Sequence, residues 1–367
     1  MKPLRIDDTY HPDRSPQFRE PLQDRRPRRR VHVGDAAGRI GGSYLFIGPP
    51  GVGKATTALA LAKSLLCERP RAGLVACGGC ASCVQADAGS HPDIDVVARP
   101  PDRATIPLEA FIGAPEHRMR DGLCWRLLLR PALGGRKVAI ILDADHLSDE
   151  AANCLLKTLE EPPDRAVIIL VGTALERQLP TIRSRCQIVR FRPLDEETVA
   201  RIISAEVEGA AVQADATAVR ACAAAAGGSL VRARQLLDPE LAAFRGRLVA
   251  LLGHRPLHGV ELARETIALV EAAGKEAPPR RARLRVVLES AIDFYRAALR
   301  RAVSGELPAD RGTAAAVEAL GADAEQAEQA IRTTLDTLAA IDRNANLSIL
   351  VDAWTAVLEQ PAIAHST

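Results

Sequence analysis

Four cysteines lie close together in a glycine-rich stretch of this 367-residue sequence: Cys67, Cys77, Cys80 and Cys83. Four thiolates that converge on one ion form a structural Zn²⁺ site, and closely spaced cysteines reach the metal from short knuckles. Because no coordination position is left for water, such a site would be closed and structural. The alternative is four buried cysteines without a metal. We expect the scattered cysteines to pack as small apolar side chains. These are Cys124, Cys154, Cys186 and Cys222.

A second candidate site is a glycine-rich loop, residues 48–54, which reads Gly-Pro-Pro-Gly-Val-Gly-Lys. It follows a predicted strand and precedes a predicted helix, so its backbone N–H groups and Lys54 are placed to bind nucleotide phosphates. The next residue usually supplies a hydroxyl to Mg²⁺. Here that residue is Ala55, and Thr56 is one position too late. The loop therefore predicts binding of ATP or ADP without the usual Mg²⁺ ligand; a Gly/Pro turn that binds nothing is the alternative.

The elements that must position these sites are short apolar runs separated by helical stretches. Apolar residues make up 47% of the chain and aromatic residues only 3%, which favours helices and buried parallel strands. Continuous apolar runs are typical of strands covered on both faces, and intervening helices indicate a parallel, three-layer α/β sheet. The predicted strands are 44–47, 94–97, 138–142, 167–171 and 188–191, and the first helix is 54–66.

Strand signals stop after Pro193, and the rest of the chain has helical periodicity. Residues 196–237 form a small helical unit, and Gly227-Gly228-Ser229 lie in its closing part. Amphipathic runs follow at 284–303 and 324–340, with a final helix at 344–358. We expect Pro278-Pro279 and residues 305–308 to break the helices between them. These patterns divide the chain into three domains, 1–193 with the cysteine module at 67–83, 194–238 and 239–367.

Composition excludes several classes of protein. The net charge is only +2, so the chain as a whole lacks the strongly basic character of a non-specific nucleic-acid binder. An arginine-rich run, 25–30, is either a solvated arm or a nucleic-acid or nucleotide contact. No apolar run reaches the roughly 18 residues that span a membrane, and the polar N-terminus does not have the pattern of a signal peptide. We therefore expect a cytoplasmic protein without a membrane partner.

Two further motifs identify a family. Residues 153–163 read Asn-Cys-Leu-Leu-Lys-Thr-Leu-Glu-Glu-Pro-Pro, and residues 184–186 read Ser-Arg-Cys. Together with the phosphate-binding loop and its four-cysteine insert, they closely resemble the clamp-loader subunits of bacterial DNA polymerase III, members of the AAA+ superfamily. The resemblance is strong over 44–193. It is weaker beyond, where Ile341-Asp342-Arg343-Asn344-Ala345-Asn346-Leu347 resembles the last helix of the delta-prime subunit.

The resemblance implies an architecture and a set of partners. Residues 1–193 would form an AAA+ P-loop domain, 194–238 a helical lid and 239–367 a helical collar for oligomerisation. The chain would join gamma/tau and delta subunits in a hetero-pentamer. That complex would load a sliding clamp onto primed DNA as part of the DNA polymerase III holoenzyme.

The family contains ATP-hydrolysing gamma/tau motors and a delta-prime stator that usually does not hydrolyse ATP. Counting back from Asn153 without a gap, the position of the metal-binding Asp is Leu142, and Asp143 stands at the position of the catalytic Glu. In the family, an arginine of the lid contacts the γ-phosphate. The corresponding position here is Val231, and Arg232 lies one residue later. With Ala55, these departures remove contacts to Mg²⁺ or to the γ-phosphate, which supply most of the stabilisation in phosphoryl transfer. The stator is therefore the better interpretation.

The family's Ser-Arg-Cys arginine, here Arg185, would enter a neighbouring subunit's ATP site as a trans arginine finger; a local ion pair is the alternative. Thr173 matches a polar residue that senses the γ-phosphate, or it is a structural hydroxyl. The expected nucleotide-contacting residues are Gly48, Gly51, Gly53, Lys54, Ala55, Thr56, Asp143 and Thr173. Two other functions remain open, an active gamma/tau-type ATPase and, with little support, a zinc-containing small-molecule kinase.

Overall fold

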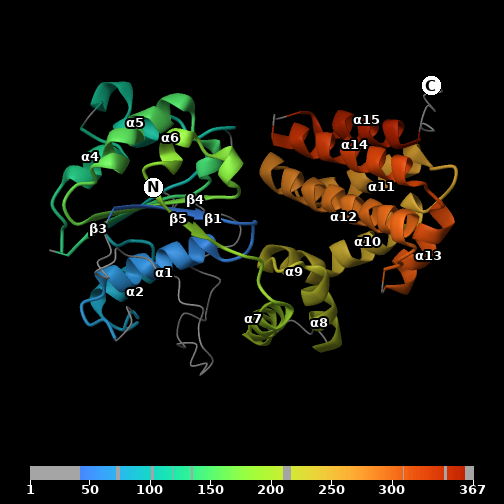
Figure 1. The fold of residues 1–367 in the computed structure, drawn as a ribbon, viewed down its shortest axis with the longest axis horizontal. Coiled ribbons are helices and arrows are strands. Elements are labelled where there is room, and N and C mark those ends of the chain that lie inside the picture. The colour runs from blue at the N-terminus through green and yellow to red at the C-terminus, as the bar shows by residue number, and fades with distance from the viewer. Residues whose placement is uncertain are drawn as a thin grey trace. The chain divides into compact units, whose positions relative to one another are not determined.

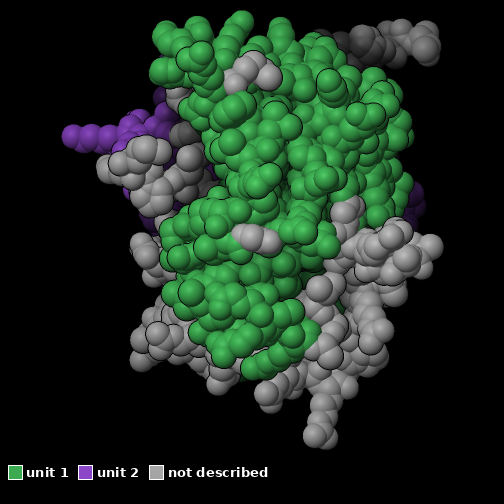
Figure 2. Space-filling model, turned by 90° about the vertical axis from the view of Figure 1, so that its left-hand side faces the viewer, with its two compact units in different colours: residues 1–234 green, residues 235–367 purple. Residues whose placement is uncertain are grey.

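The computed structural model describes residues 42–71, 75–100, 103–118, 120–133, 135–209, 216–308, 310–342 and 345–359. The predictions for the arginine-rich run 25–30 and for residues 343–344 lie outside these ranges. The chain divides into two compact units, residues 1–234 and 235–367, which Figure 2 colours separately.

The first unit is built on a five-stranded sheet with the order β2-β3-β4-β1-β5. All strand pairs in it are parallel, with Tyr44 of β1 opposite Ile169 of β4 and Gln187 of β5. The parallel sheet predicted from the sequence is confirmed. The strands are β1 (Gly42–Ile47), β2 (Ile94–Val97), β3 (Lys137–Ile141), β4 (Ala166–Gly172) and β5 (Gln187–Arg190).

Helices cover both faces of this sheet, because successive residues of a strand point to opposite faces. Tyr44 and Phe46 pack with α1 (Lys54–Leu66) on one face. Leu45 and Ile47 pack with α5 (Asp149–Glu160) on the other. Figure 1 shows the resulting layers, with α1 and α2 on one side of the strands and α4, α5 and α6 on the other. The three-layer α/β arrangement is therefore also confirmed.

Short helices complete the first unit. The α-helices are α2 (Ala81–Asp87), α3 (Glu109–Ile112), α4 (Leu123–Leu128), α6 (Pro180–Arg183), α7 (Glu196–Gly209), α8 (Ala216–Ala225) and α9 (Leu230–Leu237). The 3₁₀ turns are η1 (Pro115–His117), η2 (Ala144–His146) and η3 (Leu175–Arg177). Helix α9 contains the boundary between the two units.

The second unit is entirely helical in its described residues. Its helices are α10 (Pro239–Leu252), α11 (Gly259–Ala272), α12 (Ala277–Ser304), α13 (Arg311–Leu320), α14 (Ala324–Asp342) and α15 (Leu347–Glu359). They enclose one apolar core, in which the indole N–H of Trp354 on α15 donates to Thr334 Oγ1 on α14 at 3.1 Å.

The predicted helix break at Pro278-Pro279 is wrong, because these prolines form the first turn of α12. Proline is compatible with that turn, since the N–H groups there have no partner inside the helix. The predicted break after α12 is correct, and Gly305 ends the helix with φ 74°. Among the described residues, no helix combines the length and the apolar character that crossing a membrane requires.

Candidate functional site

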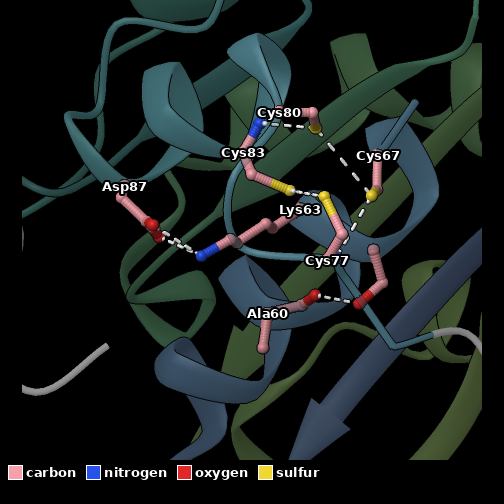
Figure 3. Close-up of polar contacts among 8 residues, drawn as sticks. Ala60, Lys63, Cys67, Cys77, Cys80, Cys83 and Asp87 are labelled. Atoms are coloured by element: carbon pink, nitrogen blue, oxygen red, sulfur yellow. Dashed lines mark hydrogen bonds and ion pairs between the residues drawn. The ribbon is translucent and has the colours of Figure 1, made fainter. Parts of the chain in front are cut away.

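The four cysteines predicted from the sequence converge at the junction of α1 and α2, and Figure 3 shows their sulfurs facing one another. All four Sγ atoms lie within 4.8 Å of one another. The Cys67–Cys80 sulfurs are 3.9 Å apart and the Cys77–Cys83 sulfurs 4.0 Å. Four sulfurs at the Zn–S distance of about 2.3 Å form a tetrahedron with edges of about 3.8 Å. The cluster therefore fits a four-coordinate metal such as zinc.

Local backbone geometry produces this convergence. Cys67 directly follows α1, and Cys80 is the N-cap of α2, accepting from the N–H of Cys83 at 3.4 Å. The N–H of Cys77 donates to Cys67 Sγ at 3.3 Å. These N–H groups stabilise negative charge on sulfur, which is the form that binds a metal.

The pKa values of the thiols differ because their surroundings differ. Backbone hydrogen bonding, chiefly from Gly79, lowers the pKa of Cys77 to about 6. Burial raises the pKa of Cys83 to about 12. A metal ion would have to displace the proton of Cys83, so metal binding to this cluster releases protons.

Two buried polar side chains, Lys63 and Ser82, attach the cysteine module to α1. Lys63 of α1 donates to both carboxylate oxygens of Asp87 on α2, at 2.6 and 2.5 Å (Figure 3). Ser82 donates to the carbonyl of Leu66 at 2.7 Å and contacts His91 Nε2 at 2.8 Å. The module is therefore joined to the helix that carries Lys54.

The predicted phosphate-binding loop lies between β1 and α1. Two of its glycines are required for space. A Cβ at Gly48 would collide with the carbonyl of Phe191, and one at Gly51, which has φ +75°, would collide with Ser229. Lys54 is only 7% exposed, and its ammonium donates to the carbonyls of Gly48 and Pro49 at 2.7 and 2.6 Å. The lysine thus lies within the loop.

The residues that replace the usual metal and γ-phosphate contacts are apolar and lie near this loop. Ala55 and Leu142 pack in the core between the sheet and α1, and Leu142 is 4% exposed. Val231 lies beside Gly51, and the N–H of Leu230 donates to the Gly51 carbonyl at 2.8 Å. Thr56 is exposed on α1. At positions 55, 142 and 231, therefore, the loop meets apolar side chains that cannot bind Mg²⁺ or a phosphate.

Two aspartates with different surroundings follow β3. Asp143 is exposed and has φ 54°. Asp145 accepts from the N–H and the hydroxyl of Thr173 at 2.7 and 2.6 Å, and its other oxygen accepts from Gln178. Both oxygens of Asp145 thus hold the segment that follows β4. The hydroxyl of Thr173, a candidate γ-phosphate contact, is part of this structural contact.

Arg185 follows α6 and is half-buried. Its Nε donates to Glu160 at the end of α5 at 2.9 Å, and Nη1 donates to the Thr181 carbonyl at 3.2 Å and to Ser184 Oγ at 3.4 Å. Its side chain is 30% exposed, and Nη2 has no partner among the described residues. The Arg185–Glu160 ion pair therefore joins the 153–163 motif to the 184–186 motif.

Sequence reasoning missed three of these partners. Glu160 lies inside a quoted motif, but nothing in the sequence paired it with Arg185. Asp145 was visible as a second aspartate after the strand, whereas Gln178 gives no sequence signal. The predicted small-apolar role of Cys124, Cys154 and Cys186 agrees with their packing against the core beside α5, but Cys124 and Cys154 also contact each other.

Known proteins resemble the first part of this chain. Residues 31–195 match the family model described as "DNA polymerase III, delta subunit". A Pseudomonas aeruginosa protein named DNA polymerase III subunit delta' is 41% identical over 144 residues, 39% of this chain and 41% of the relative. The Escherichia coli delta' subunit is 37% identical over 171 residues, 47% of this chain and 48% of the relative.

A gamma/tau subunit from Mycobacterium bovis is 33% identical over 245 residues, 65% of this chain and 40% of the relative. These matches span less than half the length of each relative. A solved gamma subunit-related protein from Thermotoga maritima is 18% identical over 87% of this chain and 94% of its own, with a TM-score of 0.41.

The predicted resemblance to DNA polymerase III clamp-loader subunits is therefore confirmed. The Pseudomonas aeruginosa and Escherichia coli relatives are both delta' subunits, so the resemblance extends to the delta' type.

Proposed function

We propose that this chain is the delta'-type stator of a DNA polymerase III clamp loader. In this role it completes a hetero-pentamer with gamma/tau and delta subunits that loads a sliding clamp onto primed DNA. The observation that carries the proposal is the apolar character of the P-loop surroundings, where Ala55, Leu142 and Val231 replace Mg²⁺ and γ-phosphate contacts. The loop and Lys54 can still bind the phosphates of ATP or ADP.

The chemical contribution of the chain is Arg185, acting as an arginine finger in a neighbour's ATP site. Glu160 and the Thr181 carbonyl hold one edge of the guanidinium, while Nη2 keeps its hydrogen-bonding capacity for a phosphate oxygen. A finger preorganised in this way loses less entropy when it meets the transition state. The alternative interpretation of Arg185 as part of a local ion pair rests on this same contact with Glu160. The two interpretations differ in whether the neighbour also uses Arg185.

The other parts of the chain have supporting roles in this proposal. Zinc at Cys67, Cys77, Cys80 and Cys83 would be structural, because the four sulfurs fill its coordination positions. Residues 1–193 are the AAA+ domain, 194–238 the lid and 239–367 the collar that holds the pentamer together.

A gamma/tau-type ATPase is the second candidate, and one observation favours it. The gamma/tau relative matches 65% of this chain, whereas the delta' relatives match 39% and 47%. Against it, β3 is followed directly by a buried Leu142, and Asp145 has both oxygens engaged by Thr173 and Gln178. Without a metal ligand, the main electrostatic stabilisation of phosphoryl transfer is lost.

Two measurements on the purified chain separate these candidates. The stator model predicts no Mg²⁺-dependent ATP hydrolysis above the level of the Lys54→Ala variant. It also predicts a stable complex with gamma/tau and delta subunits in size-exclusion chromatography. Hydrolysis by the chain alone that disappears in Lys54→Ala would establish the motor instead. Failure to join either subunit would contradict both candidates.

A further inference from the structure

Two cysteines outside the metal cluster form a pair that the proposed function does not use. Cys124 is in α4 and Cys154 is in α5, 30 residues apart in the chain, and their sulfurs are 3.9 Å apart. Both side chains are half-buried at the edge of the core that α5 shares with the sheet. They are the pair of thiols closest to each other outside the metal cluster among the described residues.

We propose that Cys124 and Cys154 are a peroxide-sensitive thiol pair that forms a reversible disulfide between α4 and α5. A disulfide has an S–S bond of about 2.05 Å, so the sulfurs must approach by about 1.9 Å. Helix α4 has only six residues and follows Gly122, so it is the more movable partner. Two side chains of α4, Leu123 and Leu127, are 0% and 2% exposed and keep the helix against the same core during that movement.

The surroundings give the two thiols different roles. The hydroxyl of Thr158, one turn after Cys154 on α5, donates to Cys124 Sγ at 3.9 Å. Hydrogen bonding from Cys154, opposed by burial and assisted by Thr158, lowers the pKa of Cys124 to about 7. The hydrogen bond with Cys124 and burial raise the pKa of Cys154. Cys124 is therefore the nucleophile, because the thiolate is the reactive form.

The reaction is balanced with hydrogen peroxide as the oxidant. The Cys124 thiolate attacks one peroxide oxygen, the O–O bond breaks, and the hydroxide that leaves takes up a proton to become water. Cys124 is then a sulfenic acid. The sulfur of Cys154 attacks Cys124, the S–O bond breaks, and a second water leaves with the Cys154 proton. Two thiols are thereby oxidised to one disulfide while one peroxide is reduced to two waters.

Cys186 provides an internal comparison. It packs against the same core and is also half-buried. Burial raises the pKa of its thiol to about 12, and no sulfur lies within hydrogen-bonding distance of it among the described residues. Cys124 should therefore react with peroxide at least about tenfold faster than Cys186 near pH 7.

The test uses the full chain loaded with zinc. It is treated with one equivalent of peroxide, quenched in acid with N-ethylmaleimide, digested with trypsin and analysed by mass spectrometry without reduction. Cys124 falls in peptide 121–126, Cys154 in 138–157 and Cys186 in 186–190. The expected product is 121–126 linked to 138–157, which dithiothreitol separates, with the Cys186 peptide largely alkylated. Recovery of 121–126 as the unlinked alkylated peptide would overturn the proposal. A main product linked to the metal-binding cysteines would do the same.

Two variants distinguish the roles of the thiols. In Cys154→Ser the sulfenic acid on Cys124 has no partner, so dimedone should label peptide 121–126. In the matched control Cys186→Ser, the yield of the linked peptide should be unchanged. Equal dimedone labelling of Cys124 and Cys186 in Cys154→Ser would contradict the assigned nucleophile.

Discussion

Replacing Asp145 by alanine separates a structural role for this residue from a metal-binding one. Its two oxygens accept from three donors, the N–H and hydroxyl of Thr173 and the amide of Gln178. These contacts fix the segment between β4 and α6, which leads to Arg185. If they are structural, Asp145→Ala lowers the stability of the first unit in the absence of nucleotide and Mg²⁺.

The size of the effect follows from the contacts. The Thr173 hydroxyl can rotate to another acceptor, but the Thr173 N–H and the amide of Gln178, which is 4% exposed, lose theirs. Each hydrogen bond to a charged group contributes about 1.5–3 kcal/mol, so we expect a loss of about 4 kcal/mol. Asp145→Asn keeps one acceptor and should lose about half as much. The matched control is Asp143→Asn, at the exposed neighbouring aspartate, with a change within about 0.5 kcal/mol.

The two units can unfold separately, so the assay must report on the first. The chain has two tryptophans, Trp125 in the first unit and Trp354 in the second. In a Trp354→Phe background, the fluorescence of Trp125 follows the first unit alone during urea unfolding. With a slope of about 2 kcal/mol per molar urea, Asp145→Ala should lower the midpoint by about 2 M. A midpoint within about 0.3 M of the parent would refute the structural role.

Three further predictions concern the metal cluster, His91 and the phosphate-binding loop. Cys83→Ser should lose the zinc that the full chain binds, as measured by atomic absorption. Because burial raises the pKa of Cys83 to about 12, zinc affinity should weaken at least about tenfold per pH unit on acidification; a pH-independent affinity would contradict this assignment. Burial, partly opposed by Asp93, lowers the pKa of His91, so its contribution to stability is present above about pH 6.5 and is lost as pH falls through the folded pKa. His91→Gln should flatten the pH dependence of urea unfolding there, and an unchanged slope would refute it. Gly51→Ala and Gly53→Ala both strain the backbone, but only the methyl group at position 51 also collides with Ser229. In the same urea assay, Gly51→Ala should therefore destabilise the first unit by about 1–3 kcal/mol more than Gly53→Ala. Equal losses would contradict the loop geometry.

The sheet could be predicted from sequence because its strands are continuous apolar runs, as in Val-Ile-Ile-Leu-Val at 167–171. Helix 54–66 was predicted to the residue because the glycine-rich loop precedes its first residue and its Ala/Leu-rich sequence extends to Leu66. Pro278-Pro279 misled because the same dipeptide either breaks a helix or begins one, and only the packing of α12 decides between them.

The candidate sites could be predicted only where their residues are close in sequence. The four cysteines lie within residues 67–83, and the phosphate-binding loop is one segment. The pairs Arg185–Glu160, Asp145–Gln178 and Cys124–Cys154 join residues 25 to 33 positions apart. Such contacts depend on how the helices and turns that follow β3 and β4 pack against one another and on the sheet, which local patterns do not encode.

The ATPase rate of the reconstituted clamp loader tests the stator proposal most directly. An arginine finger supplied in trans contributes about 10³- to 10⁵-fold to hydrolysis at the site it faces. With Arg185→Ala, the complex should still assemble and bind ATP but lose the contribution of that site, while Glu160→Gln, which keeps the arginine, should retain most of it. Arg185→Lys should also lose it, because lysine lacks the planar fork of arginine. An Arg185→Ala complex that hydrolyses ATP at the parent rate would contradict the account.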